Sequence, residues 1–351
     1  MVIHIPQQLT PLNALNFAKW LKSMHRENKY IYDFSKMQHC PPFGMLIVAN
    51  AIRAKQAAYP KSEHIPKSYD ETQGCLFASD FGFFRMCGWD IGRLPSAESY
   101  GATYIPIKRI SIKDLQNKYL DSTIILCEMV ERYSQDLAVT LTRDANSPLT
   151  SAFRYCLREI IRNSYEHGNT EEVWVCGEYW ESKNLAQIAI IDRGMGIWNS
   201  LRQNSHYNPR NDREANKMAL QPGITNTYGK KQDPFDKWEN SGYGLFASSS
   251  ICSREGSFWL CSGKDATLVN HDGQINYDID FNGTAVCMDI NTSKVQDVEK
   301  LLDEIIRTGE EKAAQYAGER VLTASKVSSI TSLIDFLFAI FNVLPDTRSI
   351  T

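Results

Sequence analysis

The sequence SAFRYCLREIIRNSYEHGN, residues 151–169, contains the pattern that decides the fold of this chain. We predict that these residues form a helix, on which Glu159, Asn163 and His167 are spaced by four and therefore share one face. A carboxylate, a carboxamide and an imidazole would then line one wall of a binding site. This set suits a magnesium nucleotide, because the carboxamide oxygen can ligate a hard cation and the carboxylate can orient or deprotonate a water. Taken alone, the same spacing also fits a solvated polar stripe.

Two β-rich runs follow this helix, and the second, LAQIAII, ends in the turn DRGMG at residues 192–196. A carboxylate at the end of a buried strand, here Asp192, can accept a hydrogen bond from an exocyclic amine. The glycines allow the backbone to approach a ligand closely. By itself, the pattern D-x-G-x-G indicates only a turn.

Two further segments have the residue types of a nucleotide site. The run NSGYGL, residues 240–245, opens a predicted helix, where glycines and free helix N–H groups favour phosphate. Gly283 and Thr284 stand between two β-rich runs, where a hydroxyl can reach a base or its bridging water. Taken alone, the NSGYGL run indicates only the start of a helix, and Gly-Thr is a common beginning of a strand.

In this order, the four segments resemble the N box, G1 box, G2 box and following Gly-Thr of the GHKL, or Bergerat-fold, ATPases, the group of gyrase, MutL and histidine kinases. Four boxes in order are far less common by chance than any one. The resemblance implies that Glu159 is the general base for the attacking water, that Asn163 ligates Mg²⁺, and that Asp192 reads the adenine of ATP. The nucleotide-binding residues that it implies are Asn163, His167, Asp192, Gly194, Met195, Gly196, Ile197, Asn240, Ser241, Gly242, Tyr243, Gly244, Leu245 and Thr284.

Within this superfamily, the run REIIRNSYEHGN is most similar to the anti-sigma-factor serine kinases, with Ser164 in place of the usual alanine. His167 is either close to the ligand or a structural histidine. No G-x-x-x-x-G-K-[ST] motif occurs in the sequence, so the phosphates would be held by the lid and the helix end.

The N-terminal run YIYDFSKMQHCPPFGMLIVANAIR resembles a STAS domain, the fold of the antagonists that such kinases phosphorylate. It begins with the second strand of a predicted strand–helix–strand opening and contains a second predicted helix after a Pro-Pro turn. Where a STAS antagonist carries its acceptor serine, this chain has Cys40-Pro41-Pro42-Phe43-Gly44. The hydroxyl is missing, and Ser35 lies earlier, where a turn is expected.

We therefore expect an α/β fold in three parts. Residues 1–112 would form a STAS-like domain with an irregular extension over 61–115, and residues 113–292 a Bergerat-fold sandwich of a mixed sheet covered by helices. Residues 293–351 would form a helical tail, whose apolar run 330–344 is a packing or partner helix. A helical pattern over 115–141 would bridge the two domains, and the polar stretch 199–243 would be a lid or disordered.

Composition limits the remaining function classes. A net charge of −3 with scattered Lys and Arg argues against a nucleic-acid partner. The apolar run near the C-terminus has 15 residues, fewer than the roughly 20 that span a bilayer, and the N-terminus lacks a signal-peptide pattern, so we expect a cytoplasmic protein. The nine cysteines are never spaced C-x-x-C, which indicates reduced, mostly buried side chains.

The function expected from these features is a Mg²⁺-dependent ATPase switch. Its lid would close on ATP and change contacts with a protein partner, through the N-terminal module, the C-terminal tail or a homodimer. The alternative is a serine/threonine protein kinase of the anti-sigma-factor type that acts on a partner in trans. A third hypothesis is a module that binds ATP without turnover.

Overall fold

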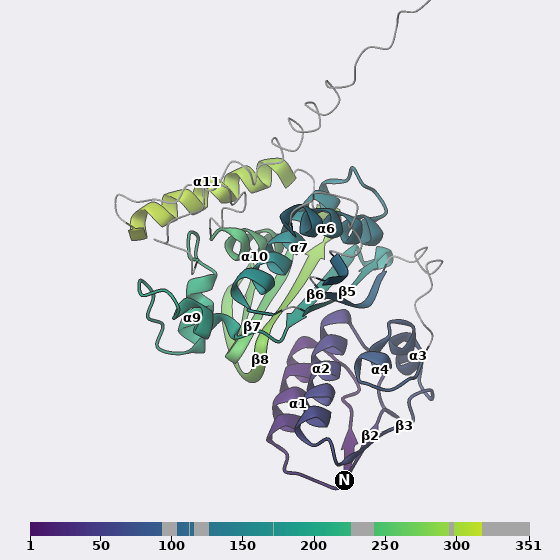
Figure 1. Cartoon of the computed structure of the whole chain (residues 1–351). Helices are drawn as coiled ribbons and strands as arrows, with labels where there is room; N and C mark the ends of the chain where they lie inside the picture. The colour runs from purple at the N-terminus through teal and green to yellow at the C-terminus, as the bar shows by residue number, and fades with distance from the viewer. Residues whose placement is uncertain are drawn as a thin grey trace, which may run out of the picture.

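The computed structural model describes residues 1–92, 104–111, 113–115, 126–170, 172–225, 242–294 and 298–317 (Figure 1). These residues form two sheets, one of three parallel strands and one of five antiparallel strands, together with helices. The predicted α/β class is confirmed at this level.

The first sheet is built by the β-rich runs at the N-terminus. Its strands β1 (Val2–His4), β2 (Lys29–Asp33) and β3 (Glu63–Lys67) lie side by side in that order. Helices α1 (Pro11–Ser23) and α2 (Pro42–Ala58) make the crossovers that parallel strands require. α1 begins where the Thr10 hydroxyl accepts from the backbone N–H of Asn13, with a proline at the start of the helix. The predicted opening and the helix after the Pro-Pro turn are confirmed.

The prediction of an irregular extension over residues 61–115 was wrong for the part that the structure describes. This stretch contains β3, α3 (Gln73–Asp80), α4 (Phe83–Met86) and β4 (Tyr104–Ser111). None of the four exceeds 8 residues, which is shorter than the window of about 11 to 18 residues in which periodicity becomes visible. β4 pairs with the second sheet as an edge strand, where Pro106 is tolerated. The domain boundaries at residues 112 and 292 stay predictions.

The second sheet has the order β4-β5-β6-β8-β7. Its other strands are β5 (Glu172–Trp180), β6 (Leu185–Asp192), β7 (Gly256–Asn270) and β8 (Gly273–Asn291). Helices α6 (Leu126–Thr142), α7 (Pro148–His167) and α10 (Gly244–Glu255) cover one face, and α11 (Val298–Ala317) lies against α10 (Figure 1). Two short helices, α8 (Gly196–Leu201) and α9 (Asp212–Ala219), flank the end of β6 and the β7–β8 hairpin.

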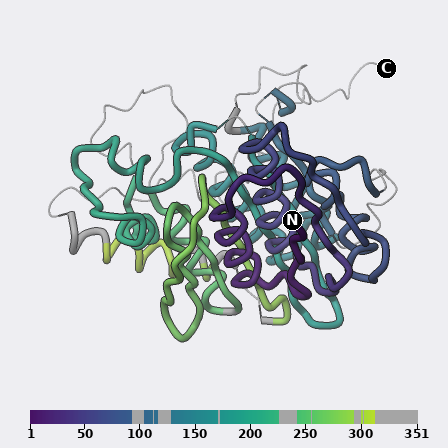
Figure 2. Tube along the Cα trace, turned by 90° about the horizontal axis from the view of Figure 1, so that it is seen from below, coloured from purple at the N-terminus to yellow at the C-terminus, as the bar shows by residue number. Residues whose placement is uncertain are grey.

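The N-terminal unit covers the opposite face of this second sheet. Along β6, Ile188 and Ile190 belong to the core under α7, whereas Ala189 and Ile191 belong to the core shared with α1 and α2. Since successive side chains of a strand point to opposite faces, a strand buried on both faces is almost continuously apolar, as LAQIAII is apart from Gln187, whose side chain is hydrogen-bonded to Phe43 and Asp289. α1 lies beside the β7–β8 hairpin, and α2 lies over β5 and β6 (Figure 2).

Several predicted features fall partly or wholly outside the described residues. The bridging helix is described from Leu126 to Thr142 and the tail from Val298 to Ala317, while the apolar run 330–344 lies outside. Within 199–243, the prediction of a lid or disorder missed α9, which Asn211 caps by accepting from the N–H of Glu214. Among the described helices, none has the length and apolar character to cross a membrane.

Candidate functional site

A pocket opens between α7, the end of β6, α8, the start of α10 and β8. It contains about 780 Å³ of space not filled by protein atoms, open solvent included. All four segments that the sequence singled out contribute to its wall. The lining residues that were predicted are Asn163, His167, Asp192, Ile197, Gly242, Gly244, Leu245 and Thr284.

Asp192 is the most strongly held polar group of this wall, and it is only 3% exposed. Its Oδ1 accepts from the backbone N–H groups of Gly194 (2.8 Å) and Thr284 (3.1 Å). Its Oδ2 accepts from the hydroxyl of Ser164 (2.9 Å). Burial raises the pKa of Asp192, although these hydrogen bonds act in the lowering direction. The side chain of Thr284 also contributes to the hydrogen bonding of Asp192, and each carboxylate oxygen can accept about two bonds.

Ser164 is the site residue whose role the sequence did not reveal. It was noted only as a departure from alanine, yet its hydroxyl joins the helix α7 to the carboxylate at the end of β6. The same hydroxyl also donates to the carbonyl of Ile160 (3.2 Å). The position of Ser164 in the sequence could have indicated this role, because Ser164 adjoins Asn163 and lies one helical turn before Gly168, which also lines the pocket.

Asn163 faces the pocket without a hydrogen bond from its carboxamide to any described residue. A half-buried amide of this kind can offer its oxygen to a ligand or a hard cation. Within the described part of the chain, no group of three or more His, Cys, Asp and Glu side chains gathers to hold a metal. A magnesium ion at Asn163 would therefore take its other ligands from phosphate and water.

Glu159 was predicted as the general base, and the structure places it beside the pocket instead of among its lining residues. The carboxylate is 7% exposed, and its Oε1 accepts from Nε (3.0 Å) and Nη2 (2.8 Å) of Arg158. Its Oε2 lies at the start of α10, where a Cβ on Gly244 would come within 2.4 Å of it. A side chain at residue 244 would require the Glu159 carboxylate to shift, and the hydrogen bonds that Arg158 donates to Glu159 all go to Oε1.

The other predicted residues have supporting positions. Gly194, Met195 and Gly196 form the turn after β6, where the N–H of Met195 donates to the carbonyl of Gly168 (2.8 Å). Tyr243 is 2% exposed and packs against Phe246 and Gly309 of α11, so its ring is not part of the pocket wall. His167 lines the pocket at the end of α7, which leaves both of its proposed roles open. Asn240 and Ser241 lie outside the described residues.

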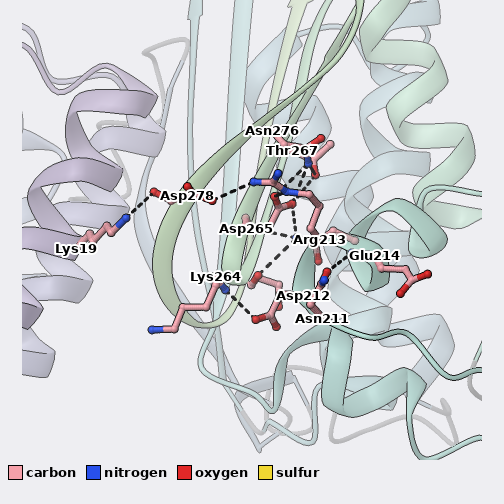
Figure 3. Close-up of polar contacts among 12 residues, drawn as sticks. Lys19, Asn211, Asp212, Arg213, Glu214, Lys264, Asp265, Thr267, Asn276 and Asp278 are labelled. Atoms are coloured by element: carbon pink, nitrogen blue, oxygen red, sulfur yellow. Dashed lines mark hydrogen bonds and ion pairs between the residues drawn. The ribbon is translucent and has the colours of Figure 1, made fainter.

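α9 is fixed beside the pocket by a polar cluster on the β7–β8 hairpin (Figure 3). Asp265, which is 1% exposed, accepts from Arg213 Nε (3.0 Å) and Asn216 Nδ2 (3.2 Å) of α9. Thr267 and Asn276 donate to the same carboxylate. Ala219, at the end of α9, thereby becomes part of the pocket wall. Sequence patterns did not indicate this cluster, because its members are far apart along the chain.

Comparisons with protein-family models, curated proteins and solved structures returned no match. The geometry of the site offers three features for chemistry. These are a buried carboxylate acceptor, an amide that faces the same space, and a glycine-rich helix start next to a second carboxylate.

Proposed function

We propose that this chain is an ATPase of the GHKL type, which binds ATP with magnesium in the pocket between α7, β6 and α10 and hydrolyses it. In this proposal the second sheet and its helices are a Bergerat fold and the N-terminal unit is STAS-like. In this proposal the nucleotide state regulates a protein partner. The observation that carries the proposal is that four segments, spread over residues 159–284, meet at one pocket.

The adenine end is the best supported part. An acceptor position on Asp192 Oδ2 would match an exocyclic amine, and the surrounding lining is largely apolar: Ile160, Ile190, Ile197 and Leu201. A purine ring needs this combination of an apolar slot and one directed polar group. Thr284, whose N–H fixes Asp192, has its hydroxyl beside the same position.

The phosphate end follows from α7 and the start of α10. Asn163 would hold the magnesium ion, whose chemistry is to neutralise charge on the phosphate oxygens. Gly242 and Gly244 bring the first N–H groups of α10 to the pocket, which suits an anion. Glu159 Oε2 would orient a water and accept its proton, while Arg158 holds the other oxygen in place.

The alternative, a protein kinase acting in trans, differs only in what accepts the phosphoryl group. Self-phosphorylation of the N-terminal unit is disfavoured, because Cys40 is 3% exposed and Phe43 is fully buried. The backbone N–H of Phe43 donates to Gln187 Oε1 of β6 (3.1 Å), so the start of α2 is covered by the second sheet. Ser35 stands in the turn after β2, where its N–H donates to Asp33 Oδ1 (3.0 Å).

The test is incubation of the full chain with γ-labelled ATP and magnesium, with Glu159→Gln in parallel. Label released as free phosphate, and reduced about 10²- to 10⁴-fold in Glu159→Gln, is the expected result. Label on a co-purified protein would favour the kinase. Binding without release or transfer would leave a module that holds ATP, and absence of binding would refute the proposal.

A further inference from the structure

The turn that carries the adenine-reading carboxylate is bonded to the N-terminal unit. Arg193 stands between Asp192 and Gly194, and its Nε donates to Oδ1 of Asn50 on α2 (2.7 Å). This bond joins residues 143 positions apart in the sequence. It is a direct polar connection from α2 to the loop at the pocket.

Asn50 and Arg193 differ in how deeply their side chains are buried. Asn50 is 9% exposed on a helix face that is otherwise mostly apolar, so its carbonyl oxygen requires a donor. Arg193 has an exposed surface, although partial burial, together with the charge of Arg53, lowers the pKa of its guanidinium. Asn50 is a neutral amide, so the bond neutralises no charge, and its consequence is geometric: it ties the turn between Asp192 and Gly194 to α2.

The other hydrogen bonds of this turn go to α7 and its C-terminal end, and to β8. Met195 N–H donates to Gly168 at the end of α7 (2.8 Å), and Asp192 is held by Ser164 and Thr284. The side-chain hydrogen bond of Arg193 goes to α2, and its guanidinium also interacts electrostatically with Arg53 of α2 and Glu172 of β5. Without this hydrogen bond, the turn would be hydrogen-bonded from the α7 and β8 sides alone.

We propose that Asn50 is a positioning residue for adenine recognition: by holding Arg193, the N-terminal unit sets the position of Asp192 and so the affinity and base selectivity of the pocket. This inference rests on the proposed ATP site. By linkage, a partner that displaces α2 would weaken ATP binding, and ATP would weaken that displacement by the same factor.

The experiment compares three full-length variants with the wild type by calorimetric titration of ATP and of GTP, with magnesium. GTP has a carbonyl where ATP has its exocyclic amine, so the ATP-to-GTP affinity ratio reports the placement of Asp192. Asn50→Ala should lower ATP affinity about fivefold, the size of one net hydrogen bond, and lower this ratio. Asn50→Asp keeps an acceptor for Arg193 and should restore both values.

The control is Lys19→Ala, which removes another contact between the units, from Lys19 Nζ to the carbonyl of Asp278 (3.2 Å, Figure 3), and should leave both values unchanged. Equal loss in Asn50→Ala and Asn50→Asp would overturn the inference, since Asn50 would then serve only the fold. So would wild-type values in Asn50→Ala.

Hydrogen exchange without nucleotide separates this inference from the proposed function. If the wild type fails to bind ATP, the proposed function fails, yet the bond still predicts faster exchange of the Gly194 and Met195 amides in Asn50→Ala than in Lys19→Ala. Equal exchange in the two variants would overturn the positioning role by itself.

Discussion

Replacing Ser164 by alanine removes one of the hydrogen bonds to Asp192 with little change in shape. Hydrogen bonds to charged groups are worth about 1.5 to 3 kcal/mol. The Ser164 hydroxyl is 5% exposed but is shared with the Ile160 carbonyl, so we expect the lower end, a loss of about 1.5 kcal/mol in the free energy of unfolding at neutral pH. Urea unfolding measures this loss.

The matched control is Ser249→Ala. Ser249 is equally buried, at 5%, and its hydroxyl donates only to the neutral carbonyl of Phe246 on the same helix (3.0 Å). Its removal should cost about 0.5 kcal/mol or less, because such a bond within a helix adds little. Equal losses in the two variants at neutral pH would refute the assignment of Ser164 as a support of a charged Asp192.

The loss of unfolding free energy in Ser164→Ala should depend on pH. Burial raises the pKa of Asp192, and the Ser164 bond lowers it, so Ser164→Ala should raise the pKa further. For an acid whose folded pKa is raised, the stability is fully present below the unfolded pKa and is lost as pH rises through the folded pKa. The deficit of Ser164→Ala should therefore be largest above that pKa and shrink in acid, and a deficit independent of pH would contradict the reasoning.

Three further predictions concern other parts of the site. Gly244→Ala would place a methyl group 2.4 Å from Glu159 Oε2, so unfolding free energy should fall by about 1 to 3 kcal/mol in urea unfolding, with weaker ATP binding; an unchanged stability would show that α10 adjusts freely. Gly309→Leu would drive atoms into the ring of Tyr243, since even a Cβ there lies 2.8 Å from it, so limited proteolysis within α11 should accelerate, and an unchanged cleavage rate would contradict the packing. ATP affinity should fall with decreasing pH from a higher pH than an ordinary aspartate would give, because protonation of Asp192 removes its acceptor; a profile flat down to the ordinary range would exclude Asp192 as the acceptor.

The sequence predicted much of the site because its residues follow local rules. Asn163 and His167 share a helix face, and Asp192 ends a mostly apolar strand, so spacing alone indicated which side chains could meet. Glycines at the start of α10 were likewise visible as a helix opening.

The remaining contacts depend on tertiary packing, which spacing does not encode. The bond between Asn50 and Arg193, and the Asp265 cluster that fixes α9, join distant segments. Glu159 was expected in the pocket because it shares a helix face with Asn163, but Arg158 and the start of α10 hold it at the side. The short elements between residues 63 and 111 were missed because four to eight residues show too little periodicity.

The central claim, an adenine nucleotide read by Asp192, is tested most directly by calorimetric titration of ATP and magnesium into the wild type and Asp192→Asn. Two backbone N–H groups require an oxygen at the Oδ1 position, so the new amide NH₂ would stand at Oδ2 and meet the adenine amine donor to donor. The account predicts that the wild type binds ATP and that Asp192→Asn binds it about ten- to a hundredfold more weakly, the cost of one unpaired buried donor. Equal affinity in the two proteins would contradict it.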